Sequence, residues 1–281
     1  KVRVLDQSRI GPILTGDPRD LGDGPPVTAL FIQNTNPMNV APDLGKVRAG
    51  FGRDDLFVCV HEQFMTETAE MADIVLPATT FLEHDDFYVA GGHTHLQVTR
   101  AVIEPVGEAR SNHDVLCALA RRLGASHPGF DMDAWGLMDE TLRRSGYSGA
   151  EAVWEGHWDD RAQAFDEAHF IDGFGHPNGK FHFAPDWSKI GGNHNGMPRL
   201  PDHDANIDNR DDDHPYRLVT APSRNYLNTS FTETATSQAR EGRPEAQIHP
   251  DICAELGLAA GGLVRIGNTQ GSVVVHVRPT E

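Results

Sequence analysis

Cysteine is scarce in this chain: Cys59, Cys117 and Cys253 are the only three among 281 residues, and they lie far apart. No two of them form a CxxC pair, so the sequence encodes neither a disulfide framework nor a cysteine-based zinc or iron–sulfur site. All three have apolar neighbours, where a free cysteine commonly behaves as a small buried hydrophobic residue. This usage fits a reducing compartment, and we expect a cytoplasmic protein.

Long hydrophobic runs are also missing. No apolar stretch approaches the roughly 18 to 20 residues that a membrane-spanning helix needs, so we expect no membrane insertion. The N-terminal sequence KVRVLDQSRIG contains neither an apolar signal-peptide core nor an initiating methionine. We therefore expect no secretory signal, and we interpret the chain as a fragment of a longer polypeptide.

Basic residues are in the minority, with 24 Lys and Arg against 41 Asp and Glu and a formal net charge of −17. Binding a nucleic-acid backbone requires clustered Lys and Arg, so we expect no nucleic-acid partner. The acidity itself is typical of a solubilising surface. The chain also has no glycine-rich phosphate fingerprint and no GxSxG elbow, and the missing elbow argues against a serine hydrolase.

The most informative stretch is residues 56–83. An apolar run at 56–60 is followed by three polar residues at 61–63, a short helical segment near 66–71 and a second apolar run at 74–76. This pattern predicts a buried strand, a helix and a parallel strand. In open α/β sheets, ligands bind at the carboxyl ends of such strands.

Polar side chains follow two predicted strands at the points where they end. The strand predicted at 27–33 runs into NTNP, and the strand at 56–60 runs into HEQ. These amides, hydroxyl, imidazole and carboxylate can bind a nucleotide's sugar and base. Because no phosphate fingerprint is present, a plain turn with solvated side chains explains the same pattern. Thr66 can likewise assist a phosphate at the next helix or simply cap that helix.

The remaining segments predict a second region of different character. Helical spacing predicts a helix over 112–123, and amphipathic segments near 133–144 and 154–165 predict two more. The acidic run DHDANIDNRDDDHP, residues 202–215, is typical of a solvated linker, and residues 84–110 are typical of a surface loop.

The last seventy residues predict a mainly β structure. Short β-type runs occur at 217–221, 263–266 and 273–277, NTQG at 268–271 predicts a hairpin turn, and 250–256 predicts a short helix. Such short strands favour a barrel or a sandwich. The polar loop that follows 217–221 is either a long connection or the lip of a ligand site, with an arginine available for a phosphate.

A metal site at the histidine-rich segment is not expected. His84, Asp85, Asp86, His93 and His95 supply ligand types, and His93 and His95 would share one face of a strand. A first-row metal usually needs three or four ligands in a closer set.

Several stretches, in order along the chain, resemble the molybdopterin-dinucleotide oxidoreductases of the dimethyl-sulfoxide-reductase superfamily. The phrase T-x-T-A-x-x-A-D-[IV]-[IV]-L-P, characteristic of that family, stands here as TETAEMADIVLP at 66–77, preceded by FIQNTNP at 31–37. Further on, RLVTAPSRNYLNTSF at 217–231 and IHPDICAELGLAAGGLVRIGNTQGSV at 248–273 are similar to the family's dinucleotide-binding barrel.

The resemblance implies a fold, a cofactor and partners. The fold would be α/β: a partial parallel-sheet, Rossmann-like domain at 1–145, a connecting segment at 146–212 and a truncated double-psi-type barrel at 213–281. The cofactor of the full-length protein would be molybdenum or tungsten held by molybdopterin guanine dinucleotide, with an iron–sulfur cluster upstream of this fragment. The partners would be missing N-terminal domains of the same polypeptide and an electron-transfer subunit.

The resemblance also assigns cofactor contacts residue by residue. One set would face a guanosine diphosphate: Asn34, Thr35, Asn36, His61, Glu62, Gln63 and Thr66. The other would form the pterin-facing loop of the barrel: Ser223, Arg224, Asn225, Asn228, Thr229 and Ser230. The activity implied is oxygen-atom or two-electron transfer, as in formate oxidation or S- and N-oxide reduction.

Two family features have no counterpart in this sequence. The N-terminal cluster motif is absent, and no Ser, Cys or selenocysteine matches the metal-ligating position. We therefore assign no catalytic and no metal-binding residue, and we expect no turnover from the fragment alone. The alternative is a structural or electron-transfer subunit that keeps the fold without the cofactor.

Overall fold

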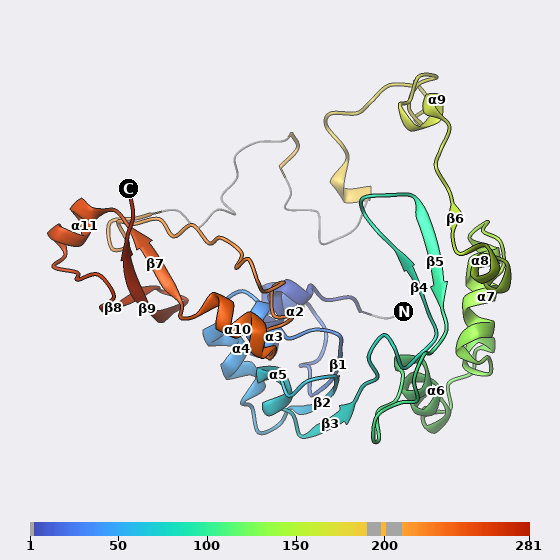
Figure 1. Ribbon diagram of the computed structural model, residues 1–281, viewed down its shortest axis with the longest axis horizontal. Helices are drawn as coiled ribbons and strands as arrows, with labels where there is room; N and C mark the ends of the chain where they lie inside the picture. Colours follow the sequence, from blue (N-terminus) through green and yellow to red (C-terminus); the bar gives the residue numbers. More distant parts are fainter. Residues whose placement is uncertain (1–2, 190–197, 201–209) are drawn as a thin grey trace. The chain divides into compact units, whose positions relative to one another are not determined.

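The computed structural model describes residues 3–189, 198–200 and 210–281 (Figure 1). The chain forms two compact units. Unit 1 consists of Lys1–Cys59, Met65–Asp73 and Asp202–Glu281, and unit 2 consists of Val60–Phe64 and Ile74–Pro201. Within the described residues, no helix combines the length and the apolar character that crossing a membrane requires.

The first part of unit 1 is built of short helices beside strands. The helical elements are η1 (Gln7–Arg9), α1 (Ile10–Leu14), α2 (Pro18–Leu21), α3 (Pro37–Val40), α4 (Leu44–Phe51) and α5 (Glu67–Glu70), and the strands are β1 (Ala29–Gln33) and the first half of β2 (Phe57–Glu62), whose residues from Val60 onward belong to unit 2. Asp43 caps α4 by accepting from the Lys46 N–H, and Gly52 is the C-cap of the helix. Leu14, Val47 and Val58 are buried, so helices and strand share this core.

The predicted strand–helix–strand pattern is confirmed. β1, β2 and β3 (Ile74–Pro77) form a sheet in that order. The Asp73 N–H donates to the Val58 carbonyl at 2.9 Å, and the Ala78 N–H donates to the Glu62 carbonyl at 3.0 Å. The residue number rises on both strands from the first of these bonds to the second, from Val58 to Glu62 and from Asp73 to Ala78. β2 and β3 are therefore parallel.

The C-terminal part of unit 1 contains a three-stranded sheet and two helices. Its elements are α10 (Ala235–Glu241), β7 (Glu245–Ile248), α11 (Pro250–Glu255), β8 (Leu263–Asn268) and β9 (Gly271–Pro279). The order is β7-β9-β8, with β7 parallel and β8 antiparallel to β9. The hairpin predicted at 268–271 is confirmed, since Asn268 pairs with Gly271. The double-psi barrel stays a prediction.

Unit 2 packs helices against a small antiparallel sheet. The strands are β4 (Asp86–Val89), β5 (His95–Thr99) and β6 (Asp159–Asp160), and the helical elements are α6 (Asn112–Leu123), η2 (Pro128–Phe130), α7 (Ala134–Arg144), α8 (Ala150–Gly156), α9 (Phe165–Ala168) and η3 (Trp187–Lys189). Its core joins β5 to α7 and α8 through Leu96, Val98, Leu142, Ala150 and Val153.

Three sequence predictions are corrected by the structure. Residues 84–110 are not a plain surface loop, because β4 and β5 pair antiparallel within them. The helix expected near 154–165 ends at Gly156, since His157 takes a φ of +69° and Asp159 then pairs with Leu96. The strand expected at 217–221 does not form. Most of the predicted acidic linker, 202–209, lies outside the described residues, and the domain boundaries stay predictions.

Candidate functional site

The predicted strand-end residues are divided between the two units. Asn34, Thr35, Asn36 and Thr66 belong to unit 1, whereas His61, Glu62 and Gln63 belong to unit 2. A third group, the loop 220–230, belongs to unit 1.

The end of β1 separates exposed from buried polar side chains. Asn34 and Thr35 are exposed, and Asn34 has a φ of +57°, a left-handed conformation that Asn tolerates. Asn36 is buried instead. Its Nδ2 donates to Glu67 Oε2 at 2.8 Å, and its Oδ1 accepts from the Thr68 hydroxyl at 2.6 Å. Asn34 and Thr35 thus face solvent, while the side chain of Asn36 is engaged within the fold.

The threonines of the characteristic phrase have different roles. Thr66 is the N-cap of α5, and its hydroxyl accepts from the Ala69 N–H at 3.3 Å. Thr68 is fully buried, and besides its bond to Asn36 it accepts from the Met38 N–H at 3.1 Å. Sequence reasoning missed Thr68, although the T-x-T spacing was the available signal.

The end of β2 lies in unit 2 and is held by main-chain partners. His61 is fully buried, with Nε2 at 3.1 Å from the Arg110 carbonyl. The exposed Gln63 donates from Nε2 to the Thr79 carbonyl at 3.0 Å, which leaves its amide oxygen as an acceptor. The Glu62 carboxylate accepts from the Gln63 N–H at 2.7 Å. The hydroxyl of Thr79 lies 2.8 Å from His84 Nδ1, a support that the sequence did not indicate.

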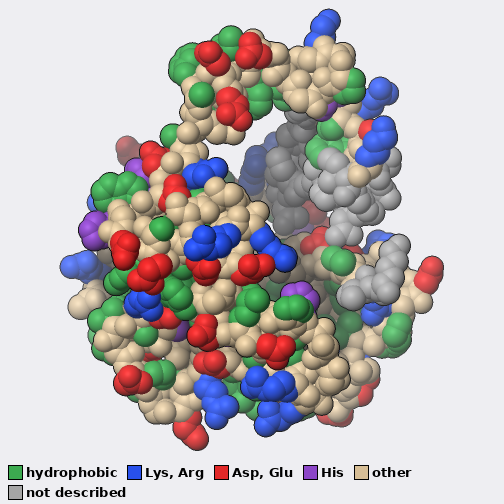
Figure 2. Space-filling model, turned by 90° about the vertical axis from the view of Figure 1, so that its right-hand side faces the viewer, with side chains coloured by type: hydrophobic (Ala, Val, Ile, Leu, Met, Phe, Trp, Pro, Cys, Tyr) green, Lys and Arg blue, Asp and Glu red, His purple; other side chains and the backbone are tan. Residues whose placement is uncertain are grey.

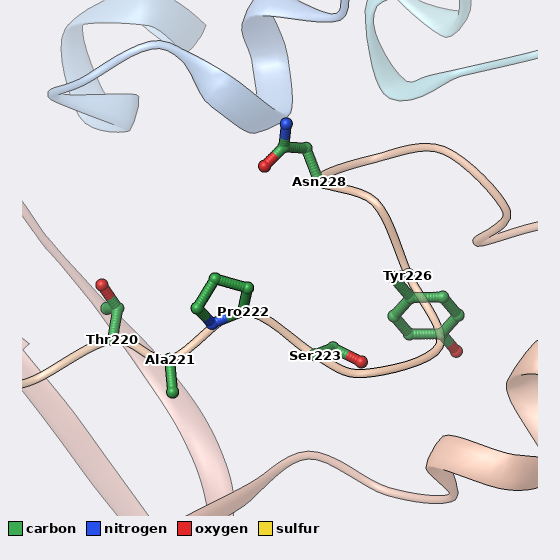
Figure 3. A pocket seen from close by; sticks show the side chains of 6 residues that line it. All are labelled: Thr220, Ala221, Pro222, Ser223, Tyr226 and Asn228. Atoms are coloured by element: carbon green, nitrogen blue, oxygen red, sulfur yellow. The ribbon is translucent and has the colours of Figure 1, made fainter. Parts of the chain in front are cut away.

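The loop after the predicted strand 217–221 lines an open cavity of about 220 Å³ (Figure 3). Asn228 lines it with a φ of +52°, and the loop turns back on itself because Leu227 and Ser230 exchange two backbone hydrogen bonds. The Thr229 carbonyl accepts from the Thr232 hydroxyl at 2.8 Å. The cavity is lined by neutral residues only: Thr220, Ala221, Pro222, Ser223, Tyr226 and Asn228.

Glu241 of α10 anchors the start of this loop. Its Oε1 accepts from the Asn225 backbone N–H at 2.5 Å and from Asn225 Nδ2 at 2.7 Å. The neighbouring Ser223 hydroxyl and these N–H groups hold the pKa of Glu241 below its usual value. Asn225 is thereby engaged within the fold, so Glu241 is a supporting residue that sequence reasoning missed.

Two side chains of the loop have polar groups left for a ligand. Ser223 Oγ is buried beside the Glu241 carboxylate, whose pKa it lowers, although the contact does not meet the geometry of a full hydrogen bond within the described part of the chain. The Arg224 guanidinium is exposed and forms no ion pair with any described residue. Since a hydroxyl can both donate and accept, Ser223 keeps hydrogen-bonding capacity beyond Glu241, and the Arg224 guanidinium keeps its donors.

The donor set of this loop fits an anionic, hydrogen-bonding cofactor. A guanidinium suits a phosphate, and a hydroxyl and an amide suit pterin or sugar heteroatoms. Complete small-molecule sites measure about 300–1,000 Å³, so a cavity of about 220 Å³ holds only one section of a dinucleotide. The remaining section would require contacts elsewhere in the protein.

Comparison with known families identifies both sections of the chain. A family model of molybdopterin oxidoreductases matches residues 23–122, and one of the molybdopterin dinucleotide binding domain matches residues 216–281. The first match contains the ends of β1 and β2, and the second contains the loop 220–230.

Individual relatives agree with these matches. The chain is 33% identical to the probable oxidoreductase YoaE of Bacillus subtilis, over 96% of this chain and 38% of that protein. It is 26% identical to the dimethyl sulfoxide/trimethylamine N-oxide reductase of Rhodobacter capsulatus, over 92% of this chain and 34% of that protein. The chain thus spans about a third of the length of these curated relatives.

A solved structure supports the fold. Acetylene hydratase from Pelobacter acetylenicus superposes with a TM-score of 0.76 at 20% identity, covering 98% of this chain and 37% of that one. This similarity agrees with the mixed α/β fold and the parallel sheet described above. The chain belongs to the molybdopterin oxidoreductases of the dimethyl-sulfoxide-reductase superfamily, whose cofactor is molybdenum with molybdopterin guanine dinucleotide.

Proposed function

We propose that this chain supplies part of the cofactor-binding surface of a molybdenum oxidoreductase that transfers oxygen atoms or electron pairs. The observation that carries the proposal is the exposed Arg224 guanidinium, which forms no ion pair with any described residue and lies within the span of the dinucleotide-binding match. The names of two relatives, an oxidoreductase and an S- and N-oxide reductase, support the reaction class.

The residues of the chain bind and orient the cofactor, and the cofactor supplies the redox chemistry when bound. Arg224 pairs with a phosphate or another anionic group, while Ser223 and Asn228 hydrogen-bond uncharged heteroatoms. The exposed strand-end side chains of Asn34, Thr35 and Gln63 supply further contacts. Asn36, His61 and Asn225 act indirectly, because their side chains are bonded within the fold.

The chain by itself is proposed to lack turnover. No residue here is assigned as a metal ligand or as a proton donor to a substrate. We propose the oxygen-atom or two-electron transfer, the electron-transfer partner and the cytoplasmic location for the complete polypeptide and not for this chain alone.

The test is cofactor content in the complete polypeptide that contains this chain. We expect the purified protein to release a fluorescent oxidised pterin and molybdenum on acid denaturation. The double variant Ser223→Ala, Arg224→Ala should bind the cofactor roughly 30–2,000-fold more weakly, because the hydrogen bond of the arginine to a charged group is worth about 1.5–3 kcal/mol and the neutral one of the serine about 0.5–1.5 kcal/mol. The matched control is Arg240→Ala, an exposed arginine of α10 that makes no recorded ion pair among the described residues.

Each outcome decides between the alternatives. A wild-type protein without pterin and metal would favour the cofactor-free structural subunit. A double variant that retains as much cofactor as the Arg240→Ala control would remove the loop from the cofactor site. Equal unfolding temperatures of both variants would show that the difference arises from binding and not from misfolding.

A further inference from the structure

Residues 165–183 of unit 2 carry a cluster of exposed aromatic side chains that the proposed function does not use. The cluster runs from α9 into the following loop (Figure 1). Phe170 stacks on Phe174 at 4.7 Å between ring centroids, and Phe181 forms edge-to-face pairs with Phe174 and Phe183, at 5.3 and 4.9 Å. Phe165 stacks on His169 at 4.0 Å. We call this the aromatic segment.

The aromatic segment is ordered by its own backbone. The Phe174 N–H donates to the Gly179 carbonyl at 3.0 Å, and the Gly179 N–H donates to the His176 carbonyl at 2.8 Å. Phe170 has a φ of +54°, which is an outlier for a bulky residue and persists only where the surroundings impose it. These turn hydrogen bonds keep the aromatic side chains of the segment close to one another.

This surface has no cover within the described chain. Every hydrogen bond and ring contact of 165–183 has its partner within residues 164–183, among the residues that the structure describes. Phe183, Phe165 and Ile171 are 72%, 68% and 62% exposed, and Phe170 and Phe181 are more than half exposed. Hydrophobic side chains of this region are visible at the top of Figure 2.

The size of the surface limits what can cover it. Five side chains of this kind expose on the order of 600 Å², since an aromatic residue buries about 150–250 Å² when fully covered. That equals the largest apolar patch of a typical monomer, roughly 300–600 Å². A separate partner usually requires about 800 Å² on each side. Interfaces between domains of one chain start lower, at about 600–1,500 Å² in total.

We infer that the aromatic segment docks onto another domain of the same polypeptide, in the section that the curated relatives have and this sequence does not span. The chain covers 38% and 34% of two of those relatives, so most of such a polypeptide is available as the partner. The rim of the segment carries Asp166, Glu167 and Asp172 against a single Lys180. The surface of the other domain that receives the segment is therefore expected to be apolar, with basic residues around its edge that complement these acidic residues. This inference is independent of the cofactor site.

Photo-crosslinking in the complete polypeptide tests the inference. Phe183 is replaced by p-benzoylphenylalanine, which preserves an aromatic side chain, and crosslinked peptides are identified by mass spectrometry. We expect a crosslink to a peptide outside this sequence, within a polypeptide of unchanged mass on a denaturing gel. The control position is Leu123, which is 75% exposed at the end of α6 and should give no such crosslink.

Three outcomes would overturn the inference. A crosslinked species of twice the mass would mean that a second copy covers the segment. Crosslinks confined to residues 165–183 would mean that the segment only packs on itself. No crosslink beyond the Leu123 control would mean that the aromatic surface stays in solvent. Cofactor content, measured on the same protein, separates any of these results from a failure of the proposed function.

Discussion

The side chain of Asn36 illustrates how a residue predicted to contact a cofactor serves the fold first. Its amide nitrogen donates to Glu67, and its oxygen accepts from Thr68 at 2.6 Å. Thr68 in turn accepts from the Met38 N–H. Since buried polar groups are costly unless paired, these bonds fix α3 against α5 and thereby the position of the exposed Asn34 and Thr35 beside them.

Replacing Thr68 by valine tests this network. The substitution keeps the shape but leaves the Asn36 oxygen and the Met38 N–H without their partner, at a cost of about 1–3 kcal/mol. We expect urea unfolding at neutral pH to show that loss. Thr141→Val on the exposed face of α7 should change stability by less than about 0.5 kcal/mol. An equal, small effect of both substitutions would contradict the structural role of Thr68.

Glu83 is a second buried polar residue with a structural role, this time in unit 2. Its Oε2 accepts from the Thr80 hydroxyl at 2.7 Å and from the Thr80 N–H at 2.6 Å, and its Oε1 accepts from the Val106 N–H at 2.6 Å. These donors lower the pKa of Glu83 from its usual 4.5. The carboxylate thereby ties the segment after β3 to the segment before α6.

The lowered pKa of Glu83 predicts a pH dependence of stability. Because the folded-state pKa lies below the unfolded-state value, the stabilisation is complete above about pH 4.5 and is lost as the pH falls through the folded-state pKa. We expect Glu83→Gln to lower the urea midpoint at pH 7 and to flatten its decline below pH 4.5. The exposed Glu104→Gln should leave both unchanged. A decline as steep in Glu83→Gln as in the wild type would assign the acid sensitivity to other carboxylates.

At the scale of elements, α1 and α4 approach each other through glycine. A Cβ added at Gly50 would lie 2.5 Å from the Leu14 Cβ, and one added at Gly11 would lie 2.8 Å from the Val47 nitrogen. Both distances are shorter than any real contact, so the helices can pack this closely only because these positions carry no side chain. Leu14, Val47 and Phe51 are buried as a result.

Gly50→Ala should therefore destabilise unit 1 although alanine is the better helix former. Overpacking against Leu14 costs about 1–3 kcal/mol, which exceeds the helix propensity gain of about 1 kcal/mol. Gly45→Ala in the same helix is the matched control, since its Cβ would meet the nearest atom at 3.4 Å. Chemical denaturation should show a lower midpoint for Gly50→Ala and an unchanged or higher one for Gly45→Ala. A stabilised Gly50→Ala would contradict the close packing.

The sequence predicts best those elements that local chemistry determines. The helix at Asn112–Leu123 has the predicted bounds because Ser111 caps it and Gly124 ends it in the left-handed conformation. The hairpin at 268–271 forms because Asn268 Oδ1 accepts from the Gln270 N–H at 2.8 Å. These signals lie within a few residues of each other, so a single sequence contains them.

Elements and side chains that depend on distant partners could not be predicted in this way. β6 exists because Asp159 and Asp160 pair with β5, more than sixty residues away. The side chain of His61 can likewise be buried because it forms a hydrogen bond with the Arg110 carbonyl. The side chain of Asn36 can be buried because it bonds Glu67 and Thr68. The sequence therefore indicates that polar residues gather at strand ends, but not which of them point into the fold.

At the scale of the whole molecule, the dominant electrostatic feature is the formal net charge of −17. Like charges repel one another in the compact state, and each exposed ion pair contributes only about 0–1 kcal/mol to the free energy of unfolding. Pairs such as Arg143–Asp139 and Arg144–Glu140 are of this exposed kind. The excess of carboxylates should therefore outweigh the ion pairs in setting how stability responds to salt.

Raising the salt concentration should consequently stabilise the protein. Between 0.01 M and 0.1 M ionic strength the Debye length falls from about 30 Å to about 10 Å, which screens repulsion across the surface more than it weakens ion pairs in direct contact. We expect the unfolding temperature at pH 7 to rise by a few degrees, roughly 2–4 °C per kcal/mol gained. Sodium and potassium chloride should act alike, because screening depends on ionic strength. A fall in the unfolding temperature would mean that the ion pairs, and not the net charge of −17, dominate the surface electrostatics.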